Sequence, residues 1–354
     1  MMHPIVLEDL QEILSSPLDW QRFRGKTVLV TGANGCLPSC MVETLLQLNK
    51  DAGMQCRVIG LVRNLDRARQ RFSDYLDCPE LSFIVGDVAK EIVIPERCDF
   101  IIHAASQASP KYYGPDPVGT MTANLMGTCH LLELARIWGS EGFLFLSSGE
   151  VYGQVQADKI PTSENDYGFI DLLNPRSCYA ESKRAAETLV ASYVQQFKLP
   201  AVIVRPFHTY GPGMAVDDGR VYADFVNDVV LKRNIILRSD GTAVRAFCYL
   251  SDGVKAFFTI LLNGQPGEAY NSGNPDAVCS IAELAETLTS LFPDWNLGVQ
   301  RLGTPTAGYL PSPVSISIPN VDRLKALGWK ARYSVEEGFA RTIRYYSERQ
   351  HGPV

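Results

Sequence analysis

The sequence lacks the features that would place the protein in a membrane or on a nucleic acid. No apolar stretch among its 354 residues reaches the length of a membrane span. The N-terminus has no basic region followed by an apolar one, so we predict no signal peptide. A net charge of −6 disfavours a nucleic-acid or membrane partner that binds through bulk charge. We therefore expect a cytoplasmic protein with neither of these partners.

The cysteines lack the pattern of a metal site or of a disulfide framework. Nine cysteines stand at scattered spacings, with no C-x-x-C pair and no Cys/His ligand cluster. An odd number of cysteines without a framework indicates free thiols in a reducing compartment. We therefore predict no metal and no disulfide scaffold.

From Lys26 onward, apolar runs typical of strands alternate with segments typical of helices. The strand-like runs are TVLVTG, CRVIGLV, LSFIVGDV, CDFIIHAA and FLFLSS. Continuous apolar runs that alternate with helices indicate a parallel sheet covered on both faces. With right-handed crossovers, this pattern predicts an α/β fold with a doubly wound (Rossmann) parallel sheet.

We divide the chain into three parts. Residues 5–23 resemble a short amphipathic helix that breaks at a Ser-Ser-Pro sequence, so residues 1–25 are predicted to be an N-terminal helical extension. Residues 26–205 are predicted to form the dinucleotide-binding domain. In residues 206–350 proline and glycine cluster and the elements become short, which indicates a smaller substrate-binding lobe whose chain crosses back to the core.

A glycine-rich turn follows the first predicted strand and opens a helix. In TVLVTGANGCLPS, Gly32 and Gly35 allow a tight turn and close approach of a diphosphate to a helix N-terminus. Pro38 stands at the third glycine position, where proline suits the first turn of a helix. Arg63 ends the second strand, where an acid would bind ribose hydroxyls; an arginine can bind a 2′-phosphate, stack on adenine or face solvent. We predict NAD as the cofactor, with NADP possible because of Arg63.

A tyrosine and a lysine stand four residues apart in a predicted helix. Tyr179 and Lys183 therefore share one face. We expect the ammonium to lower the phenol pKa from about 10 toward neutrality, which would suit an acid or base for an alcohol–ketone couple. Ser148, at the end of the fifth strand, offers a hydroxyl to the reacting oxygen.

At this point the sequence resembles the extended short-chain dehydrogenase/reductases over roughly residues 25–345. The motifs TGANG, GDV, HAAS, NLMGT, SSGEVYG, YAESK and RPFHTYGPG occur in the expected order. The stretches HAASQASPKYY, NPRSCYAESKRAAETL, DDGRVYADF and RAFCYLSDGV are most similar to UDP-glucuronate decarboxylases and their nucleotide-sugar epimerase and dehydratase relatives.

The resemblance implies a tightly held NAD(P) and a nucleotide-diphosphate sugar whose C4 hydroxyl is oxidised by hydride transfer. It makes Ser148, Tyr179 and Lys183 the catalytic triad and gives Asn124 a supporting role in the active-site geometry. Relatives commonly dimerise through two helices, which here would span residues 120–138 and 179–196. We therefore expect a homodimer.

The predicted site residues fall into two groups. The expected cofactor contacts are Gly32, Asn34, Gly35, Cys36, Leu37, Arg63, Asp87, Val88, Ala104, Ala105, Asn124, Tyr179, Lys183 and Pro206. The expected substrate contacts are Ser106, Ser148, Gly149, Glu150, His208, Arg220 and Arg245. We expect Asp87 to meet the adenine amine, and Arg220 and Arg245 to hold the nucleotide and diphosphate unless each forms a surface ion pair.

Four positions depart from the family pattern or decide its chemistry. The dTDP-glucose dehydratases carry an Asp–Glu pair after the triad hydroxyl, and the resembling stretch of the decarboxylases carries Ser–Glu; here Gly149 precedes Glu150. Ser317 stands where a decarboxylase arginine would hold the substrate carboxylate. His208 replaces the usual asparagine and either contacts substrate or packs in its loop. Glu150 serves either as a base at C5 or a hydrogen-bond partner of the sugar, or it merely caps a helix or pairs with a base.

We predict an NAD(P)-dependent nucleotide-sugar enzyme that works through a transient 4-keto sugar, and we favour epimerisation for its middle step. UDP-glucuronate decarboxylation and 4,6-dehydration are the alternatives within this class, and reduction of a 4-keto sugar is a further one. A non-catalytic cofactor-binding sensor is the alternative from another class. Substituting Tyr179→Phe separates the enzyme from the sensor, because binding survives and turnover does not.

Overall fold

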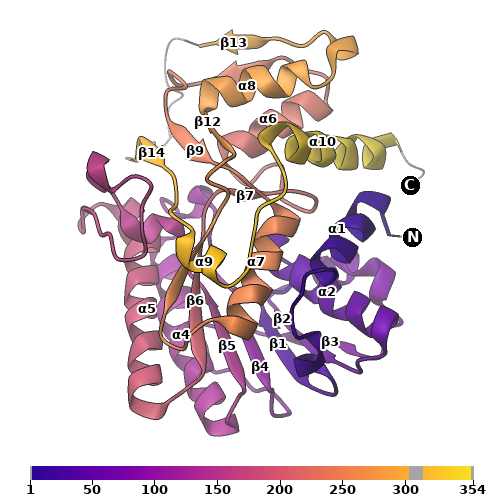
Figure 1. Cartoon of the computed structure of the whole chain (residues 1–354), viewed down its shortest axis with the longest axis vertical. Helices are drawn as coiled ribbons and strands as arrows, with labels where there is room; N and C mark the ends of the chain where they lie inside the picture. Colours follow the sequence, from indigo (N-terminus) through magenta and orange to yellow (C-terminus); the bar gives the residue numbers. More distant parts are fainter. Residues whose placement is uncertain (1, 303–313, 352–354) are drawn as a thin grey trace.

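The computed structural model of the protein describes residues 2–302 and 314–351. Figure 1 shows a parallel sheet between layers of helices, with a smaller lobe above its carboxyl edge. The order of strands in the sheet is β11-β6-β5-β4-β1-β2-β3. The strands of this sheet are β1 (Thr27–Thr31), β2 (Arg57–Val62), β3 (Leu81–Val85), β4 (Phe100–His103), β5 (Gly142–Leu146), β6 (Ala201–Pro206) and β11 (Ala269–Ser272).

Every neighbouring pair of strands in this sheet is parallel. The residues of β1, β4 and β5 are all buried, because helices cover both faces of the sheet. The strand order reverses between β1 and β4, which is the place where an open α/β sheet leaves a crevice at its carboxyl edge. The predicted doubly wound fold is therefore confirmed.

Two layers of helices enclose the sheet and a third group builds the smaller lobe. One apolar core combines side chains of α1, α2, α3 and α7 with one face of the sheet, and another combines α4 and α5 with the other face. The helices are α1 (Pro4–Leu14), α2 (Cys36–Ala52), α3 (Leu65–Arg71), α4 (Pro117–Trp138), α5 (Cys178–Phe197), α6 (Val221–Val230), α7 (Leu250–Asn263), α8 (Ile281–Ser290), α9 (Asp322–Ala326) and α10 (Val335–His351). Helices α6, α8 and α10 pack around a separate core in the lobe.

Short strands and single 3₁₀ turns complete the lobe and the connections. The lobe strands pair as β10 with β7, as β12-β9-β14, and as β13 with β8. They are β7 (Thr209–Tyr210), β8 (Ile235–Leu237), β9 (Val244–Ala246), β10 (Cys248–Tyr249), β12 (Val278–Ser280), β13 (Val299–Arg301) and β14 (Ile316–Ser317). The 3₁₀ turns are η1 (Trp20–Phe23), η2 (Ser73–Tyr75), η3 (Pro110–Tyr112), η4 (Gly149–Tyr152), η5 (Ala157–Lys159), η6 (Pro175–Ser177) and η7 (Pro293–Trp295).

The chain returns from the lobe to the core after residue 206. Strand β11 comes from residues 269–272 but forms the edge of the large sheet beside β6. Helix α7 packs against β5, β6 and β11. We expected the chain of residues 206–350 to cross back to the core, and strand β11 does so. The three predicted domain ranges stay predictions.

The N-terminal helix α1 joins the two parts of the molecule. It packs against α2 and α7, and Asp9 on its buried side pairs with Arg341 of α10 at 2.8 Å. The Tyr249 hydroxyl donates a hydrogen bond to the same carboxylate at 2.8 Å. Burial raises the pKa of Asp9 to about 6, and the charge of Arg341 opposes that shift. Helix α1 thus ties the lobe to the sheet through a buried polar contact.

No helix among the described residues combines the length and the apolar character needed to cross a membrane.

Candidate active site

A cavity of about 680 Å³ lies at the carboxyl ends of the strands, below the lobe. It runs from the glycine turn after β1 to β14 in the lobe. The predicted residues that line it are Gly32, Asn34, Gly35, Cys36, Leu37, Arg63, Asp87, Val88, Ala104, Ala105, Ser106, Ser148, Gly149, Glu150, Tyr179, Lys183, Pro206, His208, Arg220 and Arg245. Pro38 and Ser317 line it too. The structure therefore brings together all of the predicted site residues except Asn124.

The turn after β1 has the geometry of a diphosphate cradle. Gly32 has a φ of 65°, and a Cβ atom there would lie 2.9 Å from the Ala105 Cα atom. Gly35 caps α2, and no side chain hydrogen-bonds to the free N–H groups of this helix start. A dinucleotide diphosphate fits this place, because the glycine allows the tight turn and the helix end supplies donors.

Pro38 and Cys36 fit into this turn, and neither side chain spans it. Pro38 is buried in the first turn of α2, where the missing N–H costs no helical hydrogen bond. Burial raises the pKa of the Cys36 thiol to about 11, so the thiol stays protonated at neutral pH. Cys36 is therefore a wall residue rather than a nucleophile.

Thr31, which was not predicted as a site residue, stabilises the part of the cavity wall that follows β4. The Thr31 Oγ1 atom accepts hydrogen bonds from the backbone N–H groups of Ala104 at 3.2 Å and Ala105 at 3.1 Å. His103 lies 2.9 Å from the same oxygen through Nδ1 and 3.1 Å from Thr128 through Nε2. Burial lowers the pKa of His103 well below its usual range, so this histidine is a neutral structural link.

The catalytic candidates converge on one wall of the cavity. Helix α5 carries Tyr179 and Lys183 one turn apart, and Ser148 stands directly before η4 at the end of β5. The Lys183 ammonium donates to the backbone oxygen of Leu146 at 2.6 Å, which anchors α5 to the end of β5. Burial lowers the pKa of Lys183 to about 7, and the charge of Glu187 opposes that shift.

The expected lowering of the Tyr179 pKa is not found in the chain's own electrostatics. Burial raises the pKa of Tyr179 to about 12, and the charge of Glu150 adds to the rise. A hydrogen bond with Ser148 and the charge of Arg220 act in the opposite direction. Lys183 stands 5.9 Å from the centre of the tyrosine ring and hydrogen-bonds Leu146 instead. The prediction was wrong in direction because desolvation of the phenol outweighs the nearby positive charges.

Asn124 lies behind the cavity wall rather than in it. The residue is fully buried on α4, and its side-chain nitrogen donates to Ser182 Oγ at 2.8 Å. Its side-chain oxygen accepts a hydrogen bond from Ser106 Oγ, also at 2.8 Å. Both ends of the amide are thus used by the protein, so the expected direct contact with the cofactor is replaced by a link between α5 and the cavity wall.

Glu150 faces the cavity and pairs with an arginine that was not singled out from the sequence. Its Oε2 atom lies 3.3 Å from Nη1 of Arg176, which precedes α5 on η6. The Arg176 side chain is 14% exposed, and its guanidinium stands 5.8 Å from the centre of the Tyr113 ring. Tyr113 stacks on Tyr179 with ring centres 5.2 Å apart. The acid, its cation and the phenol of Tyr179 therefore form one cluster.

Gly149 is required by the packing beside it. A Cβ atom there would lie 3.0 to 3.1 Å from three atoms of the Phe207 ring, closer than most Cβ contacts. Phe207 packs with Val151 and Tyr152 in a small buried cluster. The chain therefore has no room for an acidic side chain before Glu150 unless Phe207 moves.

The substrate end of the cavity is lined by His208, Arg220, Arg245 and Ser317. Arg220 pairs with Asp218 at 3.0 Å while both residues line the cavity, so its contact with the nucleotide or diphosphate stays a prediction. Arg245 donates to the backbone oxygens of residues 314 and 315, and this fixes β14 beside β9. Burial lowers the pKa of His208 to about 3, assisted by the charges of Arg245 and Arg220. This histidine is neutral at physiological pH.

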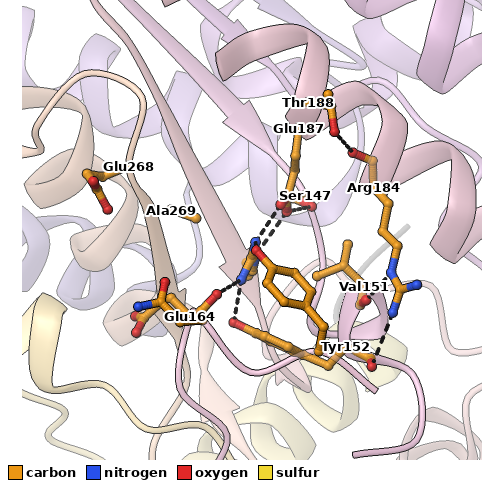
Figure 2. A network of polar contacts seen from close by, with 12 residues as sticks. Ser147, Val151, Tyr152, Glu164, Arg184, Glu187, Thr188, Glu268 and Ala269 are labelled. Carbon is orange, nitrogen blue, oxygen red and sulfur yellow. Dashed lines mark hydrogen bonds and ion pairs between the residues drawn. The ribbon is translucent and has the colours of Figure 1, made fainter. Parts of the chain in front are cut away.

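A buried polar network supports this wall from behind (Figure 2). Arg205 at the end of β6 is 2% exposed and binds Glu187 of α5 through two hydrogen bonds, of 2.9 and 2.6 Å. Ser147 donates to the same carboxylate, and Arg205 donates to the Tyr152 hydroxyl at 2.8 Å. The network joins β5, η4, α5 and β6 next to Ser148. In the sequence, only the position of Glu187, four residues after Lys183 and on the same face of the helix, pointed to a part for Glu187 near the site.

Comparison with known proteins identifies the family. A model of the NAD dependent epimerase/dehydratase family matches residues 28–273. UDP-glucuronic acid decarboxylase 6 of Arabidopsis thaliana is 32% identical over 329 residues, which cover 92% of this chain and 90% of that protein. The chain belongs to the NAD dependent epimerase/dehydratase family. The predicted family, its NAD dependence and the resemblance to UDP-glucuronate decarboxylases are thereby confirmed.

Solved structures of this family share the fold. UDP-glucuronic acid 4-epimerase from Bacillus cereus, solved with UDP-glucuronic acid and NAD, has a TM-score of 0.77 and 21% identity. The match covers 91% of this chain and 99% of that one. The dTDP-glucose 4,6-dehydratase from Bacillus anthracis, solved with NAD, has a TM-score of 0.74 and 21% identity, with 92% and 98% covered. One fold thus occurs in an epimerase and in a dehydratase.

Proposed function

We propose that this member of the family is a nucleotide-sugar epimerase that works through a transient 4-keto sugar. The observation that carries the proposal is the cavity itself. It holds a hydroxyl–phenol–ammonium triad beside a dinucleotide cradle, and Glu150 is the carboxylate beside the phenol. A sensor would need the cradle but not the triad.

The triad residues supply proton transfer at the sugar C4 hydroxyl. Held at the glycine turn after β1, NAD would supply the hydride chemistry of this oxidation and of the final reduction. Ser148 hydrogen-bonds the C4 oxygen, and Tyr179 takes its proton. Lys183, which is tied to the end of β5, holds a positive charge close to the phenol and the cofactor ribose. The raised pKa of about 12 keeps the Tyr179 phenol protonated in the free protein, so the phenol can accept the C4 proton only after bound cofactor and substrate have lowered that pKa.

Glu150 is placed to act at C5 of the keto sugar. A ketone at C4 acidifies the C5 proton, and a carboxylate at the cavity wall can remove it; the configuration inverts when a proton is returned to the opposite face of the ring. Gly149 supplies no acid for a departing hydroxyl, and the Cβ atom of any side chain there would lie tightly against the Phe207 ring. This favours epimerisation over 4,6-dehydration.

UDP-glucuronate decarboxylation is the second candidate, because the Arabidopsis relative carries that name at 32% identity over most of both chains. Against it, Ser317 lines the cavity in register with Arg245, and a serine gives a substrate carboxylate no charge partner. Arg245 donates to the backbone of residues 314 and 315. The geometry therefore supports epimerisation better than decarboxylation.

Mass spectrometry and NMR of products from a panel of UDP-, dTDP-, GDP- and CDP-sugars test the proposal. Epimerisation leaves the mass unchanged and alters the ring couplings, whereas loss of 44 or 18 mass units identifies decarboxylation or dehydration. The Tyr179→Phe variant is expected to lose turnover and keep dinucleotide binding. Tyr193→Phe, on the same helix but outside the lined cavity, is the matched control and keeps both. Turnover that persists in Tyr179→Phe contradicts the assignment of the phenol.

The homodimer and the compartment belong to the same proposal. Helix α4 exposes Val118, Met121, Met126 and Ile137, and α4 and α5 lie side by side on one face of the sheet (Figure 1). We expect a second copy to cover these residues, with light scattering of the purified chain as the measurement. All nine cysteines are free, which supports a reducing, cytoplasmic location. The three domain ranges are proposed with the boundaries given above.

A further inference from the structure

Helix α1 precedes the segment that the family model matches, which begins at residue 28. Its apolar side chains Leu10 and Ile13 are fully buried in the core that α1 shares with α2, α7 and one face of the sheet. Three of its carboxylates reach α10 of the lobe or the chain that leads into α10. In Figure 1, α1 accordingly lies between α2 and α10. The family match thus leaves unexplained a helix that touches both parts of the molecule.

Arg341 of α10 binds three groups of α1. Its guanidinium pairs with Asp9 at 2.8 Å and with Glu8 at 3.0 Å. It also donates a hydrogen bond to the backbone oxygen of Ile5 at 3.3 Å. Asp9 is 2% exposed, whereas the Glu8 side chain is 61% exposed. The pair with Asp9 is therefore the one that water and salt screen less.

The Asp9 carboxylate also connects to the wall of the cavity. The Tyr249 hydroxyl donates a hydrogen bond to it at 2.8 Å, and Tyr249 is the second residue of β10. Cys248, the first residue of β10, donates its backbone N–H to the backbone oxygen of His208 at 3.0 Å. His208 and Thr209 line the cavity, and β10 runs parallel to β7, which starts at Thr209. Asp9 thus stands behind this wall and is linked to it by two hydrogen bonds.

Helix α10 packs on the same short strand. Phe339, two residues before Arg341, is fully buried and stacks on Tyr210 of β7 with ring centres 3.7 Å apart. The Tyr249 ring meets Tyr210 edge-on, with ring centres 5.9 Å apart. Both elements that pack on Tyr210 are therefore held by the one carboxylate of α1, through the Tyr249 hydroxyl and through Arg341.

A second carboxylate of α1 fixes the chain that leads into α10. Glu12, whose side chain is 13% exposed, accepts a hydrogen bond from the Tyr333 hydroxyl at 2.6 Å and pairs with Arg332 at 3.0 Å. Glu12 stands three residues after Asp9, on the same side of the helix. Because α1 is tied to the lobe at two places, a change at Asp9 is expected to loosen the contact without releasing the helix.

We propose that Asp9 is a positioning residue for the substrate end of the cavity. Through Tyr249 and Arg341 it holds β7, and with it His208, at the end where a nucleotide sugar binds. The cradle for the dinucleotide lies at the other end, where β1 leads into α2. Loss of the Asp9 charge therefore weakens binding of the nucleotide sugar and leaves NAD binding unchanged. The inference rests on the proposed function only for the class of ligand at that end.

Hydrogen–deuterium exchange of the full chain at pH 7.5, followed by mass spectrometry of its peptides, tests the proposal without any sugar. The pKa of Asp9 is about 6, so the carboxylate is charged at this pH. Asp9→Asn keeps the shape of the side chain but leaves Arg341 without its buried counter-ion. The amides of residues 206–214 and 244–250 are then expected to exchange at least about tenfold faster. Peptides from β1 to β5 keep their rates, and calorimetry gives an unchanged NAD affinity.

Two further variants locate the effect. Tyr249→Phe removes only the hydroxyl between α1 and β10 and keeps the pair of Asp9 with Arg341, so residues 206–214 are expected to exchange about threefold faster. This variant decides the question if Asp9→Asn does not fold. Asp19→Asn removes an exposed carboxylate that makes no capping hydrogen bond to η1, and it is the matched control with no expected change.

Unchanged exchange of residues 206–214 in both variants overturns the proposal. Faster exchange that extends equally to β1–β5 also overturns it, because α1 would then stabilise the whole fold rather than position one wall. With the sugar that the product panel identifies, Asp9→Asn is expected to raise KM about tenfold at a nearly constant kcat, and a lower kcat at constant KM contradicts the assignment. A panel without any product overturns only the proposed reaction, since the exchange experiment needs no sugar.

Discussion

The Glu187→Gln substitution offers the sharpest test of how the active-site wall is held. Glu187 accepts both hydrogen bonds of a bidentate pair with Arg205, which is 2% exposed. A glutamine keeps the shape but removes the charge, so the arginine stays buried without a counter-ion. Breaking a buried ion pair in this way costs about 3–5 kcal/mol of unfolding free energy. Urea unfolding at pH 7.5 measures this loss as a lower midpoint at constant slope.

A matched substitution separates burial from charge. Glu286 lies on α8 and is paired with Arg301 at 3.7 Å, with both side chains more than 60% exposed. Glu286→Gln removes the same charge from a helix and is expected to cost less than about 1 kcal/mol, because exposed ion pairs contribute little. If Glu187→Gln costs no more than Glu286→Gln, the argument that the network stabilises the wall is refuted.

The same variant has a second consequence in activity. The charge of Glu187 raises the pKa of Lys183 against the lowering by burial. Without it, the ammonium loses its proton at lower pH, and the alkaline limb of kcat/KM moves to lower pH. An unchanged alkaline limb together with lost stability would show that Glu187 supports the fold but not the proton transfer at Lys183.

Three further predictions concern the rest of the site. Arg176→Ala removes the cation beside Glu150. It is expected to raise the pKa of the Tyr179 phenol further and so to lower turnover at neutral pH, and Arg176→Lys is expected to restore part of the turnover. A pH–rate profile of the two variants checks this. His208→Asn is expected to make the free energy of unfolding less sensitive to acid. The pKa of His208 in the folded chain is about 3, below the ordinary 6.5, so the unfolded chain binds the proton first. The free energy of unfolding therefore falls as the pH drops from about 6.5 toward 3. The slope of urea midpoints between pH 6.5 and 4 would then be shallower in the variant, and an equal slope contradicts this. Gly32→Ala places a Cβ atom against Ala105 and in a left-handed backbone at a cost of about 1 kcal/mol or more, so calorimetry is expected to show at least about fivefold weaker dinucleotide binding.

The first five strands and the location of the cofactor turn could be predicted from the sequence because their signals are local. The apolar runs in β1, β4 and β5 are continuous, and covering a parallel sheet on both faces requires that pattern. The last two strands were not predicted as members of this sheet. Strand β11 is four residues long, and its place beside β6 depends on a chain return across more than sixty residues.

The same division applies to the site. Tyr179 and Lys183 could be identified because four residues make one helical turn, and Ser148 because it ends a buried strand. The hydrogen-bond partners of Asn124 and the pKa of Tyr179 could not, because both depend on what surrounds the group in space. The amide is enclosed by Ser106 and Ser182, and the phenol is desolvated by the wall of the cavity.

The sequence by itself thus predicted the fold and the candidate triad, since periodicity and short spacings contain that information, and the resemblance of its motifs predicted the family. Only the tertiary structure decided which charges meet. Arg176 reaches Glu150 from 26 residues away, and Arg205 reaches the hydroxyl of Tyr152 from 53. The Phe207 ring explains the glycine at 149 in the same way. Such contacts depend on how distant segments pack, and the free energy of burying a charge exists only once that packing has removed water.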